Sequence, residues 1–250
     1  QNIFTLPIKA MHHIRGRKIS MIFQEPMTAL NPVHSIGKQM IEIYRLHFSE
    51  LSFEEMTIAA VKMLEKVGIP DPDKVMKKYP HQLSGGMRQR VLISMALACE
   101  PDILIADEPT TALDVTVQAQ ILDLIKSLQR KSGMSVILIT HDLGVIAENC
   151  DDVVIMYAGR IAERAEVVEL FKYPKHPYTK GLLTSIPSLA KEPKTILPTI
   201  KGNVPSLLDM PEGCRFAGRC PLVEDICRKI VPRERNIGEN HTIACHLANA

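Results

Sequence analysis

Two adjacent carboxylates follow a short apolar run near the middle of the chain. Residues 103–106 read ILIA, and Asp107 and Glu108 come directly after them. One carboxylate of such a pair can hold Mg²⁺, usually through water, and the other can polarise a water molecule that attacks a phosphoryl group. We assign the metal to Asp107 and the water to Glu108, although an isolated pair of this kind is equally typical of a loop.

Polar side chains also follow two other apolar runs of the same kind. Gln24 comes after residues 19–23 (ISMIF), and His141 comes shortly after residues 136–139 (VILI). An imidazole in that position can contact a transferred phosphoryl group and orient the attacking water. Taken singly, a histidine is more often structural, and one glutamine carries no signal.

A Ser-Gly-Gly sequence opens an apolar helix at residues 83–90 (LSGGMRQR). Ser84 can cap the first turn, and an anion can approach the free N–H groups because Gly85 and Gly86 lack Cβ atoms. These features are typical of a phosphate clamp, whereas a lone Ser-Gly-Gly more often starts an ordinary capped helix. Asp114 likewise either belongs to a site or caps the helix that follows it.

Apolar runs alternate with helical patterns up to about residue 171, which predicts an α/β domain with a parallel sheet. The runs are continuous, as in strands that are buried on both faces. Ligands of open α/β sheets bind outside the carboxyl ends of the strands. We therefore expect Gln24, Glu108 and His141 to lie at one edge of the sheet.

Helical patterns dominate the region between the first two apolar runs. Ser52 and Glu55 form a capping box, and Gly68 ends the helix that they start. Residues 27–101 contain no convincing strand, which predicts a helical insertion in the α/β domain. Outside the insertion, apolar spacing predicts a helix over residues 116–131. Two apolar segments flanking an Ala-Gly pair, at 153–157 and 160–164, predict a β-hairpin.

The composition excludes several classes of protein. With 30 Lys+Arg against 28 Asp+Glu, the formal net charge of +2 is too balanced for a dedicated nucleic-acid binder. The 46% apolar and 23% charged residues are typical of a soluble globular protein. No apolar run approaches the roughly 18 to 20 residues that cross a bilayer. We expect no nucleic-acid partner and no membrane span.

Taken together and in this order, the motifs resemble the ATP-binding cassette family of transporter ATPases. Its signature motif matches residues 83–90, its Walker B strand with the catalytic Glu matches 103–108, and its D-loop matches 112–114. Its switch His matches His141, and its Q-loop Gln matches Gln24. The resemblance implies ATP and Mg²⁺ as cofactors and assigns a role to each matching side chain. The implied residues are Glu108, His141 and Gln24 for catalysis, Ser84, Gly85, Gly86, Asp107 and Asp114 for the nucleotide, and Asp107 and Gln24 for Mg²⁺.

The amino-acid sequences in and around these motifs narrow the resemblance to the branch that imports dipeptides and oligopeptides. Four stretches carry it: 23–32 (FQEPMTALNP), 79–83 (YPHQL), 106–116 (ADEPTTALDVT) and 176–179 (HPYT). The resemblance implies a head-to-tail dimer with a second ATPase subunit, transmembrane permease partners, an indirect link to an extracellular or periplasmic peptide-binding protein, and a place on the cytoplasmic face of the membrane. Importers of nickel and other small solutes share much of these four stretches, so the sequence leaves the transported substrate undecided. A DNA-repair relative is disfavoured, because no long heptad segment or basic stripe is present.

A cassette ATPase also needs a glycine-rich loop, G-x-x-x-x-G-K-S/T, that holds the nucleotide's phosphates. The sequence contains no such loop, which in the family precedes the Q-loop by several tens of residues. We therefore expect an N-terminally incomplete ATPase domain that is inactive by itself. The alternative is a non-catalytic interaction module that retains the dimer surface and a metal-bound tail. We also expect such a fragment to fold poorly, because a missing strand exposes its neighbours.

Four of the six cysteines gather in a proline-rich segment. We predict an ATPase domain over residues 1–172 and a C-terminal extension over residues 173–250 that holds these thiols. Metal binding is favoured over disulfides, because a cytosolic ATPase keeps its thiols reduced. An iron-sulfur cluster is favoured over zinc or free thiols, because the gaps exceed those of zinc ribbons and Cys220 precedes a proline. The ligands are Cys214, Cys220, Cys227 and Cys245, the resemblance implies a 4Fe-4S cluster, and Arg215, Arg219 and Arg228 are expected to offset its charge.

Overall fold

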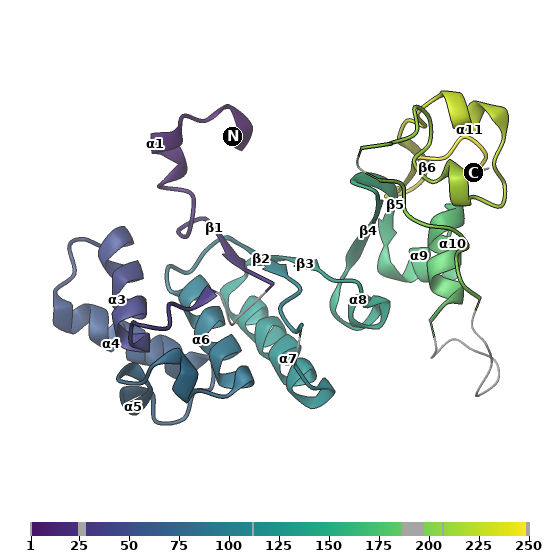
Figure 1. The fold of residues 1–250 in the computed structure, drawn as a ribbon. Coiled ribbons are helices and arrows are strands. Elements are labelled where there is room, and N and C mark those ends of the chain that lie inside the picture. The colour runs from purple at the N-terminus through teal and green to yellow at the C-terminus, as the bar shows by residue number, and fades with distance from the viewer. Residues whose placement is uncertain (1, 25–28, 112, 187–197, 207, 249–250) are drawn as a thin grey trace. The chain divides into compact units, whose positions relative to one another are not determined.

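The structure, a computed structural model, describes residues 2–24, 29–111, 113–186, 198–206 and 208–248 (Figure 1). The chain forms two compact units, Gln1–His141 and Asp142–Ala250. Three predicted features lie partly outside the described residues. These are the stretch after Gln24 (residues 25–28), Ala112 of the D-loop match, and part of the proline-rich segment (residues 187–197).

The first unit contains a three-stranded parallel sheet. Its strands are β1 (Ile19–Ile22), β2 (Ile103–Asp107) and β3 (Ser135–Ile139), in the order β1-β2-β3 (Figure 1). The register places Ile22 opposite Ala106, and Asp107 opposite Ile139. The predicted parallel sheet is confirmed, and the carboxyl ends of its three strands lie at one edge.

Helices fill the rest of the first unit. Between residues 29 and 101 the described residues form helices and no strand, as expected for the insertion. No helix in the described residues of either unit combines the length and apolar character needed to cross a bilayer. The α-helices are α1 (Ile8–Met11), α3 (Ile36–His47), α4 (Phe53–Lys66), α5 (Pro72–Met76), α6 (Gly85–Leu97) and α7 (Val115–Ser132), and the 3₁₀ turns are Ile3–Thr5 and Pro80–Gln82.

Local sequence sets where these helices begin and end. The Ser52 hydroxyl accepts a hydrogen bond from the Glu55 backbone N, and the Glu55 side chain accepts one from the Ser52 backbone N, which confirms the capping box of α4. Gly68, at φ 75°, follows that helix in the left-handed conformation that ends it. The predicted helix over residues 116–131 is α7.

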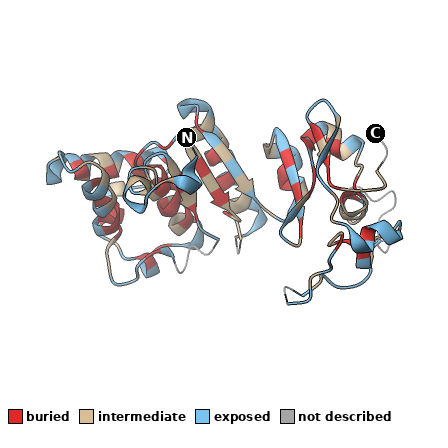
Figure 2. Cartoon of the chain, turned by 90° about the horizontal axis from the view of Figure 1, so that it is seen from above, coloured by how far each residue is buried: buried red, intermediate tan, exposed pale blue. Residues whose placement is uncertain are grey.

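The sheet packs against helices on one face. Leu104 and Ala106 of β2 are fully buried in a core that includes Leu64 of α4 and Ile93 of α6. The side chains that point the other way are less covered, and in β3 Ile137 and Ile139 are 52% and 45% exposed. Figure 2 shows intermediate and exposed residues alternating with buried ones in the sheet strands of this unit. Burial on both faces was therefore a wrong prediction for β3, because only the face with Val136 and Leu138 packs into this core.

The second unit contains a four-stranded antiparallel sheet in the order β4-β5-β7-β6. The predicted hairpin is confirmed: β4 and β5 pair through a turn at Ala158 and Gly159, whose φ angles of 47° and 76° match a type I′ turn. The elements are α8 (Leu143–Asn149), β4 (Asp152–Tyr157), β5 (Arg160–Glu166), α9 (Val167–Lys172), α10 (Pro177–Thr184), the 3₁₀ turn Ala217–Arg219, α11 (Asp225–Lys229), β6 (Arg235–Gly238) and β7 (His241–Ile243).

The two compact units divide between His141 and Asp142, which differs from the boundary between ATPase domain and extension that we predicted at 172/173 and that stays a prediction. Strand pairing explains the difference. Residues 163 and 164 of β5 pair with residues 243 and 242 of β7, so the hairpin shares a sheet with the C-terminal segment. The density of prolines, on which the prediction depended, does not report a pairing between strands that lie so far apart in the chain.

Candidate functional site

The carboxyl ends of the three parallel strands bring Gln24, Glu108 and His141 together. Ile22 lies opposite Ala106, so two residues further on Gln24 reaches the position opposite Glu108. The Gln24 Nε2 donates to Glu108 Oε2 at 2.9 Å. The Nδ1 of His141, two residues after β3, lies 3.0 Å from Glu108 Oε1. One carboxylate therefore contacts the side chains that follow both neighbouring strands.

The backbone and one further side chain fix the Glu108 carboxylate. Its backbone N donates to the Ile139 carbonyl at 2.9 Å, and its φ of 43° lies in the left-handed region that non-glycine residues rarely adopt. The Thr111 hydroxyl donates to Glu108 Oε2 at 2.8 Å. Sequence reasoning missed Thr111, although its position three residues after Glu108 was the available signal. Backbone strain held at one carboxylate is typical of functional sites.

Hydrogen bonds keep this carboxylate ionised. The contact with His141, and after it the one with Thr111, lowers the pKa of Glu108 below its ordinary value; Gln24 adds to the effect and partial burial opposes it. Glu108 is therefore ionised near neutral pH, as a general base must be, and the same partners hold the carboxylate in place. The exposed side chain of His141 and the largely covered side chain of Glu108 place the contact at the surface.

We predict that His141→Ala raises the pKa of Glu108, because the variant removes the partner that lowers it most. A carboxyl group with a lowered pKa that loses a donor must titrate at higher pH, closer to the ordinary value of about 4.3. Carbon-13 NMR of the glutamate carboxyl groups during an acid titration measures the change. Thr111→Val should produce a smaller upward shift, and an unchanged midpoint in both variants would contradict this account.

Asp107 is the last residue of β2, and no hydrogen bond in the described part of the chain joins its side chain to Gln24, Glu108 or His141. β2 ends at Asp107 and Glu108 adopts a left-handed φ of 43°, so the chain turns between the two neighbouring carboxylates. Since Gln24 Nε2 binds Glu108, its Oε1 is the atom that a cation would use. The Mg²⁺ assignment of Asp107 and Gln24 stays a prediction.

The Ser-Gly-Gly sequence forms a capped helix start, as predicted. The exposed Ser84 accepts a hydrogen bond from the Met87 backbone N at 3.3 Å, and α6 begins at Gly85. A Cβ on Gly86 would lie only 3.0 Å from Val117 Cγ1 of α7, so this glycine also permits close packing of the two helices. Within the described residues, no hydrogen bond joins Ser84 to the Glu108 site.

Asp114 caps α7, because its Oδ1 accepts a hydrogen bond from the Val117 backbone N at 3.0 Å. This is the structural alternative that the sequence left open. Because the side chain is exposed, a second role at the nucleotide is compatible with the cap and stays a prediction.

The four C-terminal cysteines converge in the second unit. Cys214, Cys220, Cys227 and Cys245 line one pocket, and the Cys214 backbone N donates to the Cys227 carbonyl at 2.7 Å. A Cβ on Gly213 would overlap that carbonyl, so only glycine allows the two segments to approach. Nevertheless, no group of three or more His, Cys, Asp or Glu side chains in the described residues is arranged to hold a metal ion. The metal centre is therefore not shown, although its predicted ligands lie together.

The thiols and their neighbouring arginines are constrained by the packing. Burial raises the pKa of the Cys214 and Cys220 thiols above the ordinary value, so both are protonated at neutral pH without a metal. Arg219 donates to the Ile200 and Lys201 carbonyls at 2.8 and 3.0 Å, and Arg215 donates to the Ala158 carbonyl. These two guanidinium groups bind backbone oxygens, which differs from the expected pairing with a cluster.

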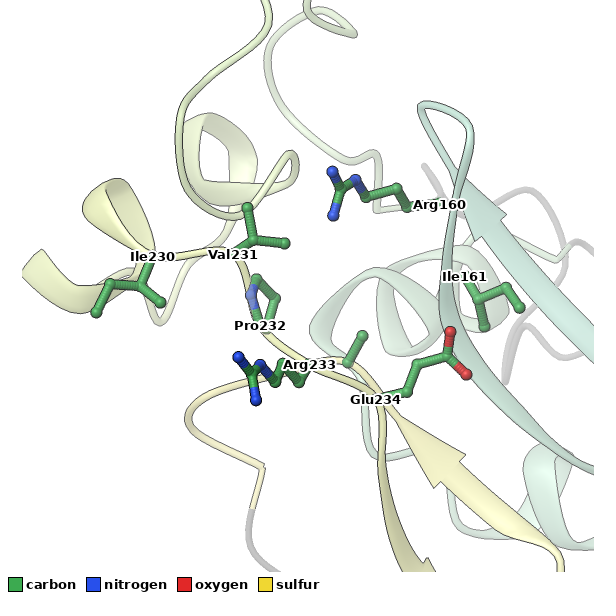
Figure 3. A pocket seen from close by; sticks show the side chains of 8 residues that line it. Arg160, Ile161, Ile230, Val231, Pro232, Arg233 and Glu234 are labelled. Atoms are coloured by element: carbon green, nitrogen blue, oxygen red, sulfur yellow. The ribbon is translucent and has the colours of Figure 1, made fainter.

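A larger pocket of about 660 Å³ lies in the same unit. Two guanidinium groups, from Arg160 and Arg233, and the Glu234 carboxylate line it together with apolar side chains (Figure 3). None of the predicted site residues contributes to its wall. We therefore assign this pocket neither to the Glu108 site nor to the four-cysteine site.

Comparison with known proteins identifies the family. The ABC transporter family matches residues 4–111, and the family "Oligopeptide/dipeptide transporter, C-terminal region" matches residues 162–227. The dipeptide transport ATP-binding protein DppD of Bacillus subtilis is 52% identical over 247 residues, which cover 99% of this chain and 73% of the relative. The chain belongs to the family of peptide ABC transporter ATP-binding subunits. The probable peptide ABC transporter ATP-binding protein y4tR of Sinorhizobium fredii, another member, is 49% identical over 249 residues, covering 100% of this chain and 74% of the relative.

Solved structures confirm the ABC ATPase fold for this member of the family. A dimeric, post-hydrolysis state of the ATP-binding cassette MJ0796, bound to ADP and Pi, matches with a TM-score of 0.57 and 29% identity. The match covers 65% of this chain and 68% of that chain. The structure of cbiO1 from Clostridium perfringens, part of the transporter complex cbiONQ, matches with a TM-score of 0.56 and 28% identity, over 66% of this chain and 62% of that one.

Proposed function

We propose that this chain is the energy-coupling ATPase subunit of an importer for dipeptides or oligopeptides. The observation that carries the proposal is the convergence of Gln24 and His141 on the Glu108 carboxylate at the carboxyl edge of a parallel sheet. The names of the relatives, which describe peptide transport, support the choice of substrate class. The permease subunits would hold the chain at the cytoplasmic face of the membrane. A peptide-binding protein on the opposite side of the membrane would deliver the substrate to the permease.

Glu108 is the general base of the proposed reaction. Its ionised carboxylate polarises the attacking water, and His141, bound to the same carboxylate, orients that water and contacts the phosphoryl group. Gln24 fixes the second carboxylate oxygen. When bound, ATP supplies the phosphoryl group and Mg²⁺ offsets its charge. The donors at the strand ends fit Mg²⁺, because Asp107 Oδ and Gln24 Oε1 are oxygen ligands.

Ser84, Gly85 and Gly86 would act on the nucleotide of a second ATPase subunit. Ser84 and Gly85 are exposed and are not joined to Glu108 within the described chain, as a site shared between two subunits requires. The N-terminal end of α6 offers N–H groups and a positive dipole to a phosphate, and Asp114 lies at the start of the adjacent helix α7. A related cassette was solved as a dimer with ADP and Pi, which supports a dimer of ATPase subunits for this chain.

The shared site can be tested by mixing. The 250 residues contain no G-x-x-x-x-G-K-S/T loop, so we expect no ATPase activity above background from the chain alone. Added to a full-length ATPase subunit of a peptide transporter, the chain should raise turnover per partner molecule, and Ser84→Arg should abolish that increase. Steady-state phosphate release measures both effects.

The matched control for Ser84→Arg is Ser52→Arg, which removes the N-cap of α4 in the same way but leaves the diglycine start intact. A lost cap costs about 1 kcal/mol in either helix. If the control keeps the increase and Ser84→Arg loses it, the effect belongs to the shared site. Equal turnover with and without the wild-type chain rejects the shared site and leaves the non-catalytic interaction module as the function.

The four cysteines would hold a 4Fe-4S cluster, with zinc as the alternative. Four thiols that line one pocket fit either group in number and in ligand type. Metals bind the thiolate form of cysteine, so binding must deprotonate these thiols. The bonds would then hold the C-terminal segment in place, which is a structural role.

A further inference from the structure

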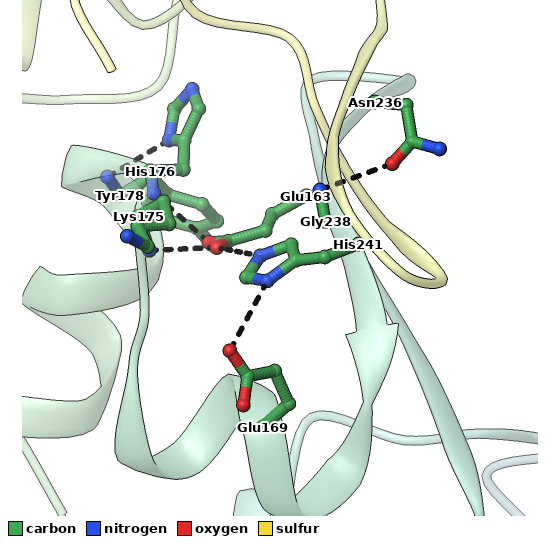
Figure 4. A network of polar contacts seen from close by, with 8 residues as sticks. All are labelled: Glu163, Glu169, Lys175, His176, Tyr178, Asn236, Gly238 and His241. Atoms are coloured by element: carbon green, nitrogen blue, oxygen red, sulfur yellow. Dashed lines mark hydrogen bonds and ion pairs between the residues drawn. The ribbon is translucent and has the colours of Figure 1, made fainter. Parts of the chain in front are cut away.

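A buried carboxyl group joins three segments of the second unit (Figure 4). The Glu163 side chain, on β5, is fully buried. Its Oε1 accepts hydrogen bonds from the Lys175 backbone N at 2.7 Å and from His241 Nε2 at 2.9 Å. Its Oε2 accepts one from the His176 backbone N at 3.0 Å. Three donors on two oxygens match a carboxylate, which only accepts.

The donors come from segments that are distant in the chain. Lys175 and His176 precede α10, whereas His241 opens β7. The His241 ring is almost fully buried, and its Nδ1 lies 3.8 Å from Glu169 Oε1 of α9. Burying a carboxyl group is costly unless its partners are well placed, and here three donors lie within 3.0 Å of its oxygens. No step of ATP hydrolysis uses this group.

The network leads directly to the thiol pocket. His176 lines that pocket beside the four cysteines, and Ala244 directly precedes Cys245. The Ala244 backbone N donates to the Ala162 carbonyl at 2.9 Å, next to Glu163 on β5. Glu163 therefore holds His176 through its backbone, and through His241 it holds β7, which ends two residues before Cys245.

We propose that Glu163 is a positioning residue for the four-thiol site. By binding His241 and the backbone before α10, it fixes β7 against β5 and holds Cys245 beside Cys214, Cys220 and Cys227. The metal-binding part of this inference rests on the proposed cluster, whereas the placement of Cys245 does not. Replacing the carboxylate by an amide removes one acceptor oxygen and turns an N–H group toward the donors, which loosens the strand without changing the volume of the side chain.

The test compares Glu163→Gln with Glu166→Gln, an exposed glutamate at the end of the same strand. In the metal-free, reduced chain, iodoacetamide labelling of each cysteine is followed by mass spectrometry. We expect Cys245 to react about tenfold faster in Glu163→Gln, which corresponds to about 1.4 kcal/mol of lost protection. The reactivity of Cys150, in the same unit but outside the pocket, and all rates in Glu166→Gln should stay unchanged.

A second measurement tests the positioning role of Glu163 separately from the proposed cluster. Metal content after anaerobic reconstitution with iron and sulfide, or with zinc, should fall in Glu163→Gln and not in Glu166→Gln. If the wild type binds neither metal while Cys245 still becomes reactive, the cluster is wrong and the positioning role stands. Equal Cys245 reactivity in wild type and Glu163→Gln overturns it. If Glu163→Gln fails to fold, His241→Gln decides by the same labelling, and unchanged Cys245 reactivity there also overturns it.

Discussion

Glu108→Gln is expected to reduce ATP turnover by about 10²–10⁴-fold, the contribution that a positioned general base makes. The amide keeps the size of the side chain but cannot take a proton from water. In the wild type, three donors converge on the carboxylate: Gln24, Thr111 and His141. In the variant, the amide N–H group faces one of these donors. No other carboxylate in the described residues shares these three partners, so we expect no substitute base.

The measurement requires a phosphate loop. A chimera in which the phosphate-loop segment of a peptide-transporter relative precedes this chain provides one, and its phosphate release is compared with and without the substitution. Asp102→Asn is the matched control, because Asp102 pairs with Lys18 at the amino ends of the same two strands. That exposed ion pair contributes little to the stability of the protein, so the turnover of Asp102→Asn should stay within about twofold of the unsubstituted chimera.

Binding of ATP distinguishes a lost base from a lost site. The Glu108→Gln chimera should retain ATP in a stable dimer, because the groups assigned to the phosphates are untouched. Retained ATP with full turnover would show that another residue activates the water. Loss of both binding and turnover in the variant would show instead that Glu108 maintains the architecture of the strand ends.

Under the proposed metal centre, Cys227→Ser should abolish metal binding by the C-terminal segment and lower the thermal stability of the second unit. Cys227 is buried, and its carbonyl accepts the hydrogen bond from Cys214 that closes the pocket. A serine preserves this backbone contact but supplies no thiolate. Structural zinc sites contribute about 10 kcal/mol or more to folding, and a cluster held by four thiolates should act similarly. Metal analysis and calorimetry of the second unit's transition, in the full chain, measure the loss.

Cys150→Ser is the matched control, because Cys150 lies in the same unit and outside the pocket. It should keep both metal content and transition temperature. A chelator should reproduce the Cys227→Ser effect in the wild type, because removing the metal removes its stabilisation by mass action. If metal analysis finds one zinc ion per chain and no iron or sulfide, the four cysteines form a zinc site and the cluster assignment is wrong. A wild type that binds no metal would leave four reduced thiols.

Local features of the fold were predictable from the sequence because each depends on residues within a few positions of one another. Ser84 and Ser52 cap their helices through a backbone N three residues away. The Ala158-Gly159 turn follows from two residues that adopt left-handed φ angles between apolar segments. The convergence of Gln24 and His141 on Glu108 follows from one rule, that parallel strands end at the same edge of a sheet.

The tertiary structure decided what depends on distant pairings. It alone shows that Ile137 and Ile139 remain exposed despite an unbroken apolar run, because burial of a strand depends on which elements pack against each face. It also assigns the hairpin to the C-terminal unit through β7.

The Glu163 contact shows the same division within one residue. A glutamate in a strand is typical of an exposed position, yet Glu163 is fully buried because His241, 78 residues away, pairs with it. The sequence determines which groups can donate and accept, and in which local elements they lie. Which of them meet depends on the closure of long loops and on the packing of whole units, and no short pattern records those contributions to the free energy.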